Sequence, residues 1–323
     1  MNFSSPSPSE QIPLQPEWLR RLEAWRGLLA RCTLRPSRKN VHALRSQTLR
    51  LRVALQQRLQ ERGADSAAAD AFRRWIKEGK KLRKALEPVR DADVYLARLS
   101  SLRSRLQGTQ DGATQPNPRC LREMSKLEAR LKRQRQRGIG ELAVVIEARG
   151  KRINRISREI EATLQPRLPS KVHSTVPEAL RIFTELTRDF PNLDAGNLHE
   201  YRKRLKQARY LVEISATTDS LAKRLAAAFR RIHNAAGEWH DWQALVLEAG
   251  RVLPGHGKQD GLLGVLEALA EKALHRALGQ CRRSTARLLQ NGGETRSLPP
   301  RKPVVSDPGL QFDDVSRKLR ISG

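Results

Sequence analysis

Two segments of the chain carry a histidine followed by cationic residues at helical spacing. In residues 198–210, cations stand three, four, seven and ten positions after His199. On an α-helix, the residues three, seven and ten positions later lie on the same side as the histidine. Arginine can grip an oxyanion with two parallel hydrogen bonds, and lysine adds a mobile point charge. The segment therefore predicts a helix that binds an elongated anion along one side.

An earlier segment repeats part of this pattern. His42 is followed by Arg45 and Arg52, again three and ten positions later, and Arg38 completes a series of arginines spaced by seven. The apolar residues fall towards the other side of the predicted helix, where they can pack: Val41, Leu44, Leu51 and Leu55. A single cationic helix side is usually just solvated, but two matched stripes favour one anion site built from two helices.

The composition indicates what kind of anion is expected. The 323 residues contain 62 Lys+Arg against 34 Asp+Glu, which gives a formal net charge of +28. Such an excess repels itself unless an acidic polymer or surface offsets it, so a polyanion is the expected partner. Aromatic residues make up only 4% of the chain. This scarcity disfavours a platform of stacked bases, and nucleic acid is the second candidate.

The periodicity of the chain is helical throughout, and no segment shows convincing strand alternation. We therefore expect an all-α protein, in which Pro and Gly separate long segments of good helix formers. Pro88 is expected in the first turn of a helix. The predicted helices are 17–33, 37–62, 65–86, 88–107, 119–137 with 140–164, 176–190, 194–216, 219–236, 238–252 and 259–290.

An internal repeat relates the two stripe helices to two later motifs. Arg90-Asp91 begins 48 positions after His42, and His240-Asp241 begins 41 positions after His199. Both aspartates are expected just after a helix start, where a carboxylate is stabilised by the helix dipole and can hold an arginine in place. We interpret each half as a four-helix unit used twice.

These motifs together resemble the conserved histidine α-helical domain, CHAD, over roughly residues 38–290. The resemblance is carried, in order, by 41–45, 88–94, 198–210 and 237–241. It implies a non-catalytic protein that binds inorganic polyphosphate, with association to polyphosphate granules. It also implies two four-helix bundles related by a pseudo-twofold axis, with the basic sides of the histidine helices lining a central channel.

The chain departs from the family pattern at two positions. Leu49 stands where the first stripe usually carries another arginine, and Glu87 replaces the usual glycine before the Arg-Asp motif. Some members are fused to a triphosphatase domain with an acidic ExExK strand motif, and we find no such motif here. Catalysis therefore has no obvious place in this sequence.

The predicted site combines both stripes and the repeat motifs. The main contacts are expected from Arg45, Arg52, Arg202, Lys206 and Arg209. Lesser contributions are expected from Arg38, Arg50, Arg90, Lys203 and Arg204, with His42 and His199 as donors that mild acid would charge. Asp91, Asp241 and Tyr210 are expected to orient these groups. We expect no cofactor and no metal, because the spacing of His233 and His240 is not that of a metal site.

Five segments are expected along the chain: a disordered tail at 1–16, a first helical half at 17–164, a linker at 165–177, a second half at 178–290 and a mostly disordered tail at 291–323. The three cysteines match no disulfide framework, and we find neither an export signal nor a long apolar run. A cytoplasmic protein without membrane insertion is therefore expected. Periodicity leaves the oligomeric state open.

Overall fold

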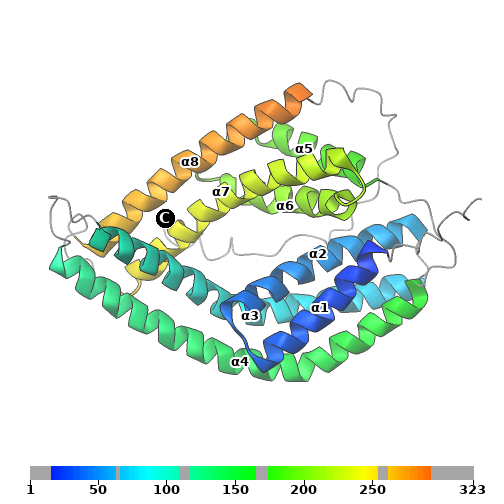
Figure 1. Ribbon diagram of the computed structural model, residues 1–323, viewed down its shortest axis with the longest axis horizontal. Coiled ribbons are helices and arrows are strands. Elements are labelled where there is room, and N and C mark those ends of the chain that lie inside the picture. Colours follow the sequence, from blue (N-terminus) through cyan, green and yellow to red (C-terminus); the bar gives the residue numbers. More distant parts are fainter. Residues whose placement is uncertain (1–15, 63–65, 109–116, 165–173, 254–260, 292–323) are drawn as a thin grey trace, which may run out of the picture.

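The structure is a computed structural model that describes residues 16–62, 66–108, 117–164, 174–253 and 261–291. Within these ranges the chain forms eight α-helices and no strand (Figure 1), which confirms the all-α prediction. The helices are α1 (Glu17–Leu34), α2 (Arg38–Arg62), α3 (Ser66–Gly108), α4 (Pro118–Leu164), α5 (Val176–Asp189), α6 (Leu198–Ser215), α7 (Ser220–Gly250) and α8 (Leu262–Asn291). Apart from Pro16 and Asn291, the predicted tails lie outside the described residues, and so does most of the predicted linker.

Three predicted helix breaks are wrong, because α3, α4 and α7 each run through them. Pro88 lies inside α3 rather than in a first turn. The residues on either side of it, Leu82, Leu86, Val89 and Ala92, stay in phase and are all buried. Packing of this continuous stripe outweighs the hydrogen bond that proline cannot make. Asp91 and Asp241 consequently lie within α3 and α7, and not just after a helix start.

The start of α6 also differs from the prediction, by four residues. Residues 194–197 form a turn in which the Asp194 carboxylate accepts hydrogen bonds from the backbone N–H groups of Gly196 and Asn197. This local bonding competes with the helix, so α6 begins at Leu198. His199 therefore lies in the first turn of the helix that carries the second stripe.

Two apolar clusters hold the helices together. The first lies among α1, α2, the first part of α3 and the last part of α4, around Trp25 and Trp75, whose rings meet edge to face at 6.0 Å. Trp25 donates to Thr48 and Trp75 to Ser157, so both buried indole N–H groups are satisfied. The second cluster contains residues of α5, α6, α7 and α8 together with the end of α3, the start of α4, and Leu49 and Val53 of α2.

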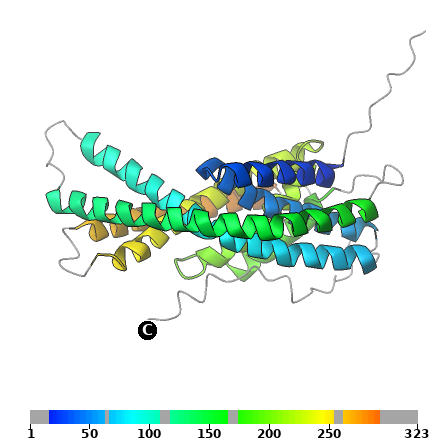
Figure 2. The same cartoon turned by 90° about the horizontal axis from the view of Figure 1, so that it is seen from below.

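The arrangement of the helices brings the two predicted stripe helices together. In Figure 1, α2 and α6 lie in the interior of the molecule, and α4 runs along its margin. Figure 2, seen from below, has α4 in front of the other helices over almost the whole length of the molecule. Contacts of α2 with α6 and of α3 with α7 connect the two halves. The pseudo-twofold relation and the proposed domain boundaries stay predictions.

Candidate functional site

Five cations from three helices gather where α2 meets α6. Lys206 of α6 is close enough to four arginines to be repelled by each of them. Burial and these charges together lower the pKa of Lys206 well below its usual value. We call this group the cationic cluster; its members are Arg45 of α2, Arg83 of α3, and Arg202, Lys206 and Arg209 of α6. The fold holds these like charges together at an electrostatic cost.

Arg202 faces both α2 and α7 within this cluster. Burial, opposed by Asp241 and assisted by Arg90, lowers its pKa to about 10. Its buried Nε atom has no hydrogen-bond partner among the described residues. A Cβ atom at Gly237 would lie 3.6 Å from that Nε, so the guanidinium packs directly against the backbone of α7. An anion could satisfy this donor.

Arg50 and Arg209 are held in place by groups of the protein. The Glu213 carboxylate accepts from Arg50 at 2.8 Å and lies 3.2 Å from the Nε atom of Arg209. Both guanidinium groups also lie over the ring of Tyr210, at 5.3 Å and 4.7 Å from its centroid. Tyr210 and Glu213 thereby fix the direction of two arginines, and Arg209 is the more rigid because its side chain is only 8% exposed.

The two aspartates of the repeat motifs meet at one arginine. Arg90 of α3 donates to Asp91 at 2.8 Å and to Asp241 of α7 at 3.0 Å. Burial alone would raise the pKa of Asp241, but His240 and Arg90 lower it to about 2. Asp241 is therefore a carboxylate near neutral pH. The pair ties α3 to α7 and partly neutralises the edge of the cationic cluster.

Three histidines border the cluster. His199 stacks on His240 with ring centroids 4.9 Å apart. Burial, His240 and the nearby cations lower the pKa of His199 to about 4. Partial burial, Arg90 and Arg50 also lower the pKa of His42.

His233 was considered in the sequence only as a metal candidate. Its pKa is lowered by burial and by Arg202, Arg209 and Lys206. His42, His199 and His233 are therefore neutral near neutral pH in the free protein.

Several predicted contacts lie away from the centre of the cluster. Lys203 pairs with Glu200 at 2.8 Å. Arg204 pairs with Asp189 at 2.7 Å and lies over the ring of Phe190, because it is off the face that carries the stripe. Arg38 is exposed in the first turn of α2, and Arg52 is half-buried two turns beyond Arg45. The structure gathers Arg45, Arg202, Lys206 and Arg209, but not these outer residues.

Arg83 is a member of the cluster that sequence reasoning missed. Its backbone carbonyl accepts a hydrogen bond from Arg45 at 3.0 Å, which fixes α2 against α3. A signal for it did exist, because Arg83 stands seven residues before Arg90, the spacing of the arginines on α2. The predicted helix break before Pro88 assigned the two arginines to different helices, where a spacing of seven does not place residues on one face.

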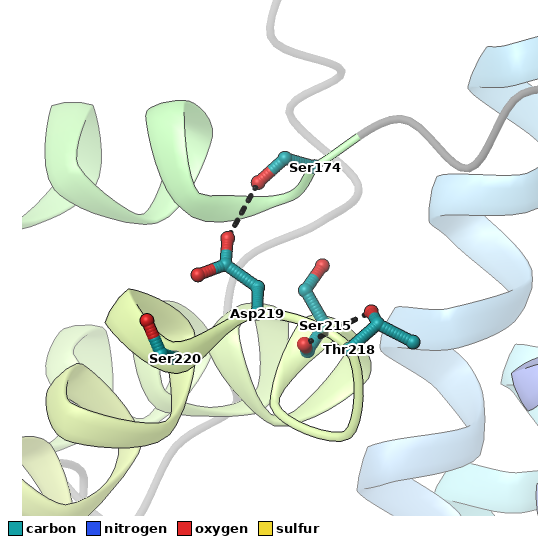
Figure 3. Close-up of a pocket in the computed structure, with 5 residues that line it drawn as sticks. All are labelled: Ser174, Ser215, Thr218, Asp219 and Ser220. Carbon is teal, nitrogen blue, oxygen red and sulfur yellow. Dashed lines mark hydrogen bonds between the residues drawn. The ribbon is translucent and has the colours of Figure 1, made fainter.

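A separate polar pocket lies between the start of α5 and the start of α7 (Figure 3). It is lined by Ser174, Ser215, Thr218, Asp219 and Ser220. Asp219 caps α7 by accepting from the N–H groups of Leu221 and Ala222, and the hydroxyl of Ser174 donates to it at 3.4 Å. The pocket is explained by helix capping, and its lining side chains include no cation.

Neither a metal cluster nor a membrane helix is found in the described part of the chain. Those residues contain no group of three or more His, Cys, Asp or Glu side chains that could hold a metal ion. None of the described helices combines the length and the apolar character needed to cross a bilayer.

Comparison with known proteins agrees with this fold. The sequence pattern of the CHAD domain matches residues 17–248. The structure resembles PptA from Streptomyces chartreusis with a TM-score of 0.52 and 17% sequence identity, covering 85% of this chain and 98% of that one. At this identity the likeness shows the fold alone. No curated protein matches the sequence. Since the domain pattern spans most of the chain, from α1 almost to the end of α7, the protein belongs to the CHAD domain family.

Proposed function

We propose that the protein binds inorganic polyphosphate, without catalysis, at the cationic cluster between α2 and α6. The observation that carries the proposal is Lys206, a half-buried cation held among four arginines. A partly buried cluster of like charges is unfavourable in the free protein, and a polyanion placed beside it would make the electrostatic interaction favourable. Membership of the CHAD family supports polyphosphate as the anion.

The surroundings of the cluster suit binding better than acid–base chemistry. The carboxylates nearest to it, Asp91, Asp241 and Glu213, all contact arginines. A carboxylate that orients a cation contributes to phosphate binding through that cation, whereas a general base needs access to a reacting proton. We therefore assign these acids to orientation.

The proposal is tested by titration with short-chain polyphosphate, in competition with duplex DNA and single-stranded RNA of matched total charge. Selective binding of polyphosphate is expected, because the cluster recognises closely spaced phosphates and the chain has few aromatics on which bases could stack. Equal displacement by each polymer would assign the affinity to net charge and favour the nucleic-acid alternative.

A double variant of the cluster and a matched control test where polyphosphate binds. Lys206→Met combined with Arg45→Gln should weaken polyphosphate binding at least tenfold, because two cluster charges are lost. The matched control, Lys223→Met with Arg224→Gln, removes the same charge from exposed positions on α7 and should bind as the parent does. Reversal of Arg202 and Arg209 to Glu is a harsher test, since Arg209 is buried beside Glu213 and the double change also threatens folding.

Location in the cytoplasm at polyphosphate granules is part of the same proposal. A fluorescent fusion should follow granules in a polyphosphate-accumulating cell, and the cluster variant should lose that pattern. A diffuse parent fusion in cells that hold granules would contradict this location without touching the binding result.

A further inference from the structure

A second set of cations lies on the outer side of α4, apart from the cationic cluster. Successive members are separated by 4, 7, 4, 14, 4 and 3 residues, so they fall on one narrow face of the helix. All seven residues are exposed. We call them the outer stripe: Arg122, Lys126, Arg133, Arg137, Lys151, Arg155 and Arg158. The first and last residues of the stripe are 36 positions apart, which corresponds to ~54 Å of helix.

The acidic residues of α4 do not neutralise this stripe. Three of them pair with arginines of other helices that pack against α4: Glu128 with Arg103 at 3.1 Å, Glu159 with Arg74 at 2.8 Å and Glu161 with Arg26 at 2.7 Å. Within the described part of the chain, no outer-stripe cation lies in an ion pair with a carboxylate. Glu141 and Glu147 are exposed and stand four residues after Arg137 and four residues before Lys151, so the seven cations exceed the acids beside them by five charges.

The outer stripe and the cationic cluster are on different sides of the molecule. Figure 1 has α2 and α6 in the interior and α4 along the margin, and Figure 2 has α4 in front when the molecule is seen from that margin. The buried face of α4 packs on α3, so its exposed cations point away from the other helices. One molecule therefore presents two separate cationic surfaces.

The shape and composition of α4 favour a flexible polyanion without bases. The helix bows outward, so the stripe lies on a convex surface (Figure 1). A stiff duplex that followed it would have to bend, which costs free energy, whereas a flexible single chain can follow the curve. The sequence of α4 contains no Phe, Trp or Tyr, so it offers neither a stacking surface for bases nor an aromatic anchor for a membrane.

We propose that the outer stripe is a second polyphosphate-binding surface, so that one protein molecule holds two segments of polymer and cross-links them. This inference rests on the proposed function of the cationic cluster. Two separate sites are not filled together by one short chain, but they can join two long chains into a network. The stripe would thereby give the protein the ability to gather polyphosphate as well as to bind it.

Calorimetric titration with short-chain polyphosphate at low salt separates the two surfaces. The parent should bind two chains per protein. Replacement of Arg133, Arg137 and Arg155 by Gln should reduce this to one chain, with the affinity of the remaining site within twofold of the parent. The control, Arg224, Arg231 and Arg287 replaced by Gln, removes the same charge from exposed positions and should keep two sites. Circular dichroism verifies that each variant is folded.

Light scattering with long-chain polyphosphate then tests cross-linking. Parent and control should form large assemblies, and the stripe variant should bind without assembling. A single site in the parent, or equal assembly by the stripe variant, would overturn the inference while the cluster assignment stands. Equal assembly of the parent with duplex DNA of matched charge would also overturn it, because the stripe would then not select a flexible chain. Absence of any polyphosphate binding by the parent would instead refute the proposed function itself.

Discussion

At the scale of single residues, the centre of the site is a lysine placed among arginines. Burial and the charges of Arg45, Arg83, Arg202 and Arg209 all oppose protonation of Lys206. Such an arrangement is unfavourable for folding, and proteins keep unfavourable groups where function needs them. Phosphate oxygens beside Lys206 would stabilise its charged form, so ligand binding and proton uptake by this residue are linked.

We predict that Lys206→Met stabilises the free protein and weakens polyphosphate binding. Loss of this half-buried charge removes repulsion and desolvation, which should raise the free energy of unfolding by about 0.5–2 kcal/mol. Chemical denaturation with and without polyphosphate measures both effects. Arg204→Met on the same helix is the control, because Arg204 pairs with Asp189 outside the cluster. Lower stability of the Lys206 variant would show that the lysine is not under repulsion.

The histidines predict that the free protein loses stability in mild acid. The pKa of folded His199 is about 4, against an ordinary value of 6.5. Between these values the unfolded chain binds more protons than the folded chain, so stability falls as pH decreases from about 6.5 towards 4. Thermal denaturation at pH 7 and pH 5 should show this decrease, and His199→Gln should reduce it. An identical decrease in the variant would assign the effect to other groups.

Polyphosphate should oppose this pH effect. Bound phosphate favours protonated His42 and His199, and burial and nearby cations lower both pKa values in the free protein. Mild acidification should therefore tighten binding, with proton uptake measurable by calorimetry in buffers of different ionisation enthalpy. An affinity that is equal at pH 7 and pH 5.5 would contradict a protonated role for these residues.

At the scale of helices, the crossing of α3 and α4 decides the shape of the scaffold. A Cβ atom at Gly138 would lie 3.1 Å from Val89 Cγ2 and 3.3 Å from the Cβ of Pro88. The absence of a side chain lets α4 approach α3 at the proline, where the helix backbone lacks one hydrogen bond. This close contact explains why α3 continues through Pro88 instead of ending there.

Two glycines of α4 give a matched test of that contact. Gly138→Ala should destabilise the fold by about 1–3 kcal/mol, because the added methyl group overpacks the crossing. Gly140→Ala meets nothing within 4 Å and should stabilise it by up to about 1 kcal/mol, since alanine is the better helix former. Urea denaturation compares the two, and equal effects would show that the crossing is not tightly packed.

The helices themselves could be predicted from the sequence, but their continuity could not. Apolar residues at spacings of three and four gave the correct class and placed Leu44, Leu51 and Leu55 in the core, where they are buried. The breaks at Pro88 and at Gly237 were wrong, because the local cost of these residues is visible in the sequence whereas the packing that offsets it comes from distant helices.

At the scale of the whole molecule, the net charge of +28 determines how binding responds to salt. We predict that polyphosphate affinity falls linearly on a double logarithmic plot against salt concentration, because bound cations of the polymer are released. The Lys206→Met, Arg45→Gln variant should reduce the slope by about 2, one for each contact removed. Affinity measured at four salt concentrations tests this, and a flat response would show that ion pairs with the polymer do not carry the binding.

The sequence by itself determined the all-α class, the two histidine stripes and the family resemblance, because these depend on residue type and on spacing within single helices. It did not identify Arg83 as a member of the cluster, and it ranked Arg52 with the main contacts although Arg52 is not a member of the cluster. Only the tertiary structure decided which cations meet, since that depends on how α2, α3, α6 and α7 pack. Charges on different helices interact according to distance in space, and the order of residues along the chain does not specify that distance.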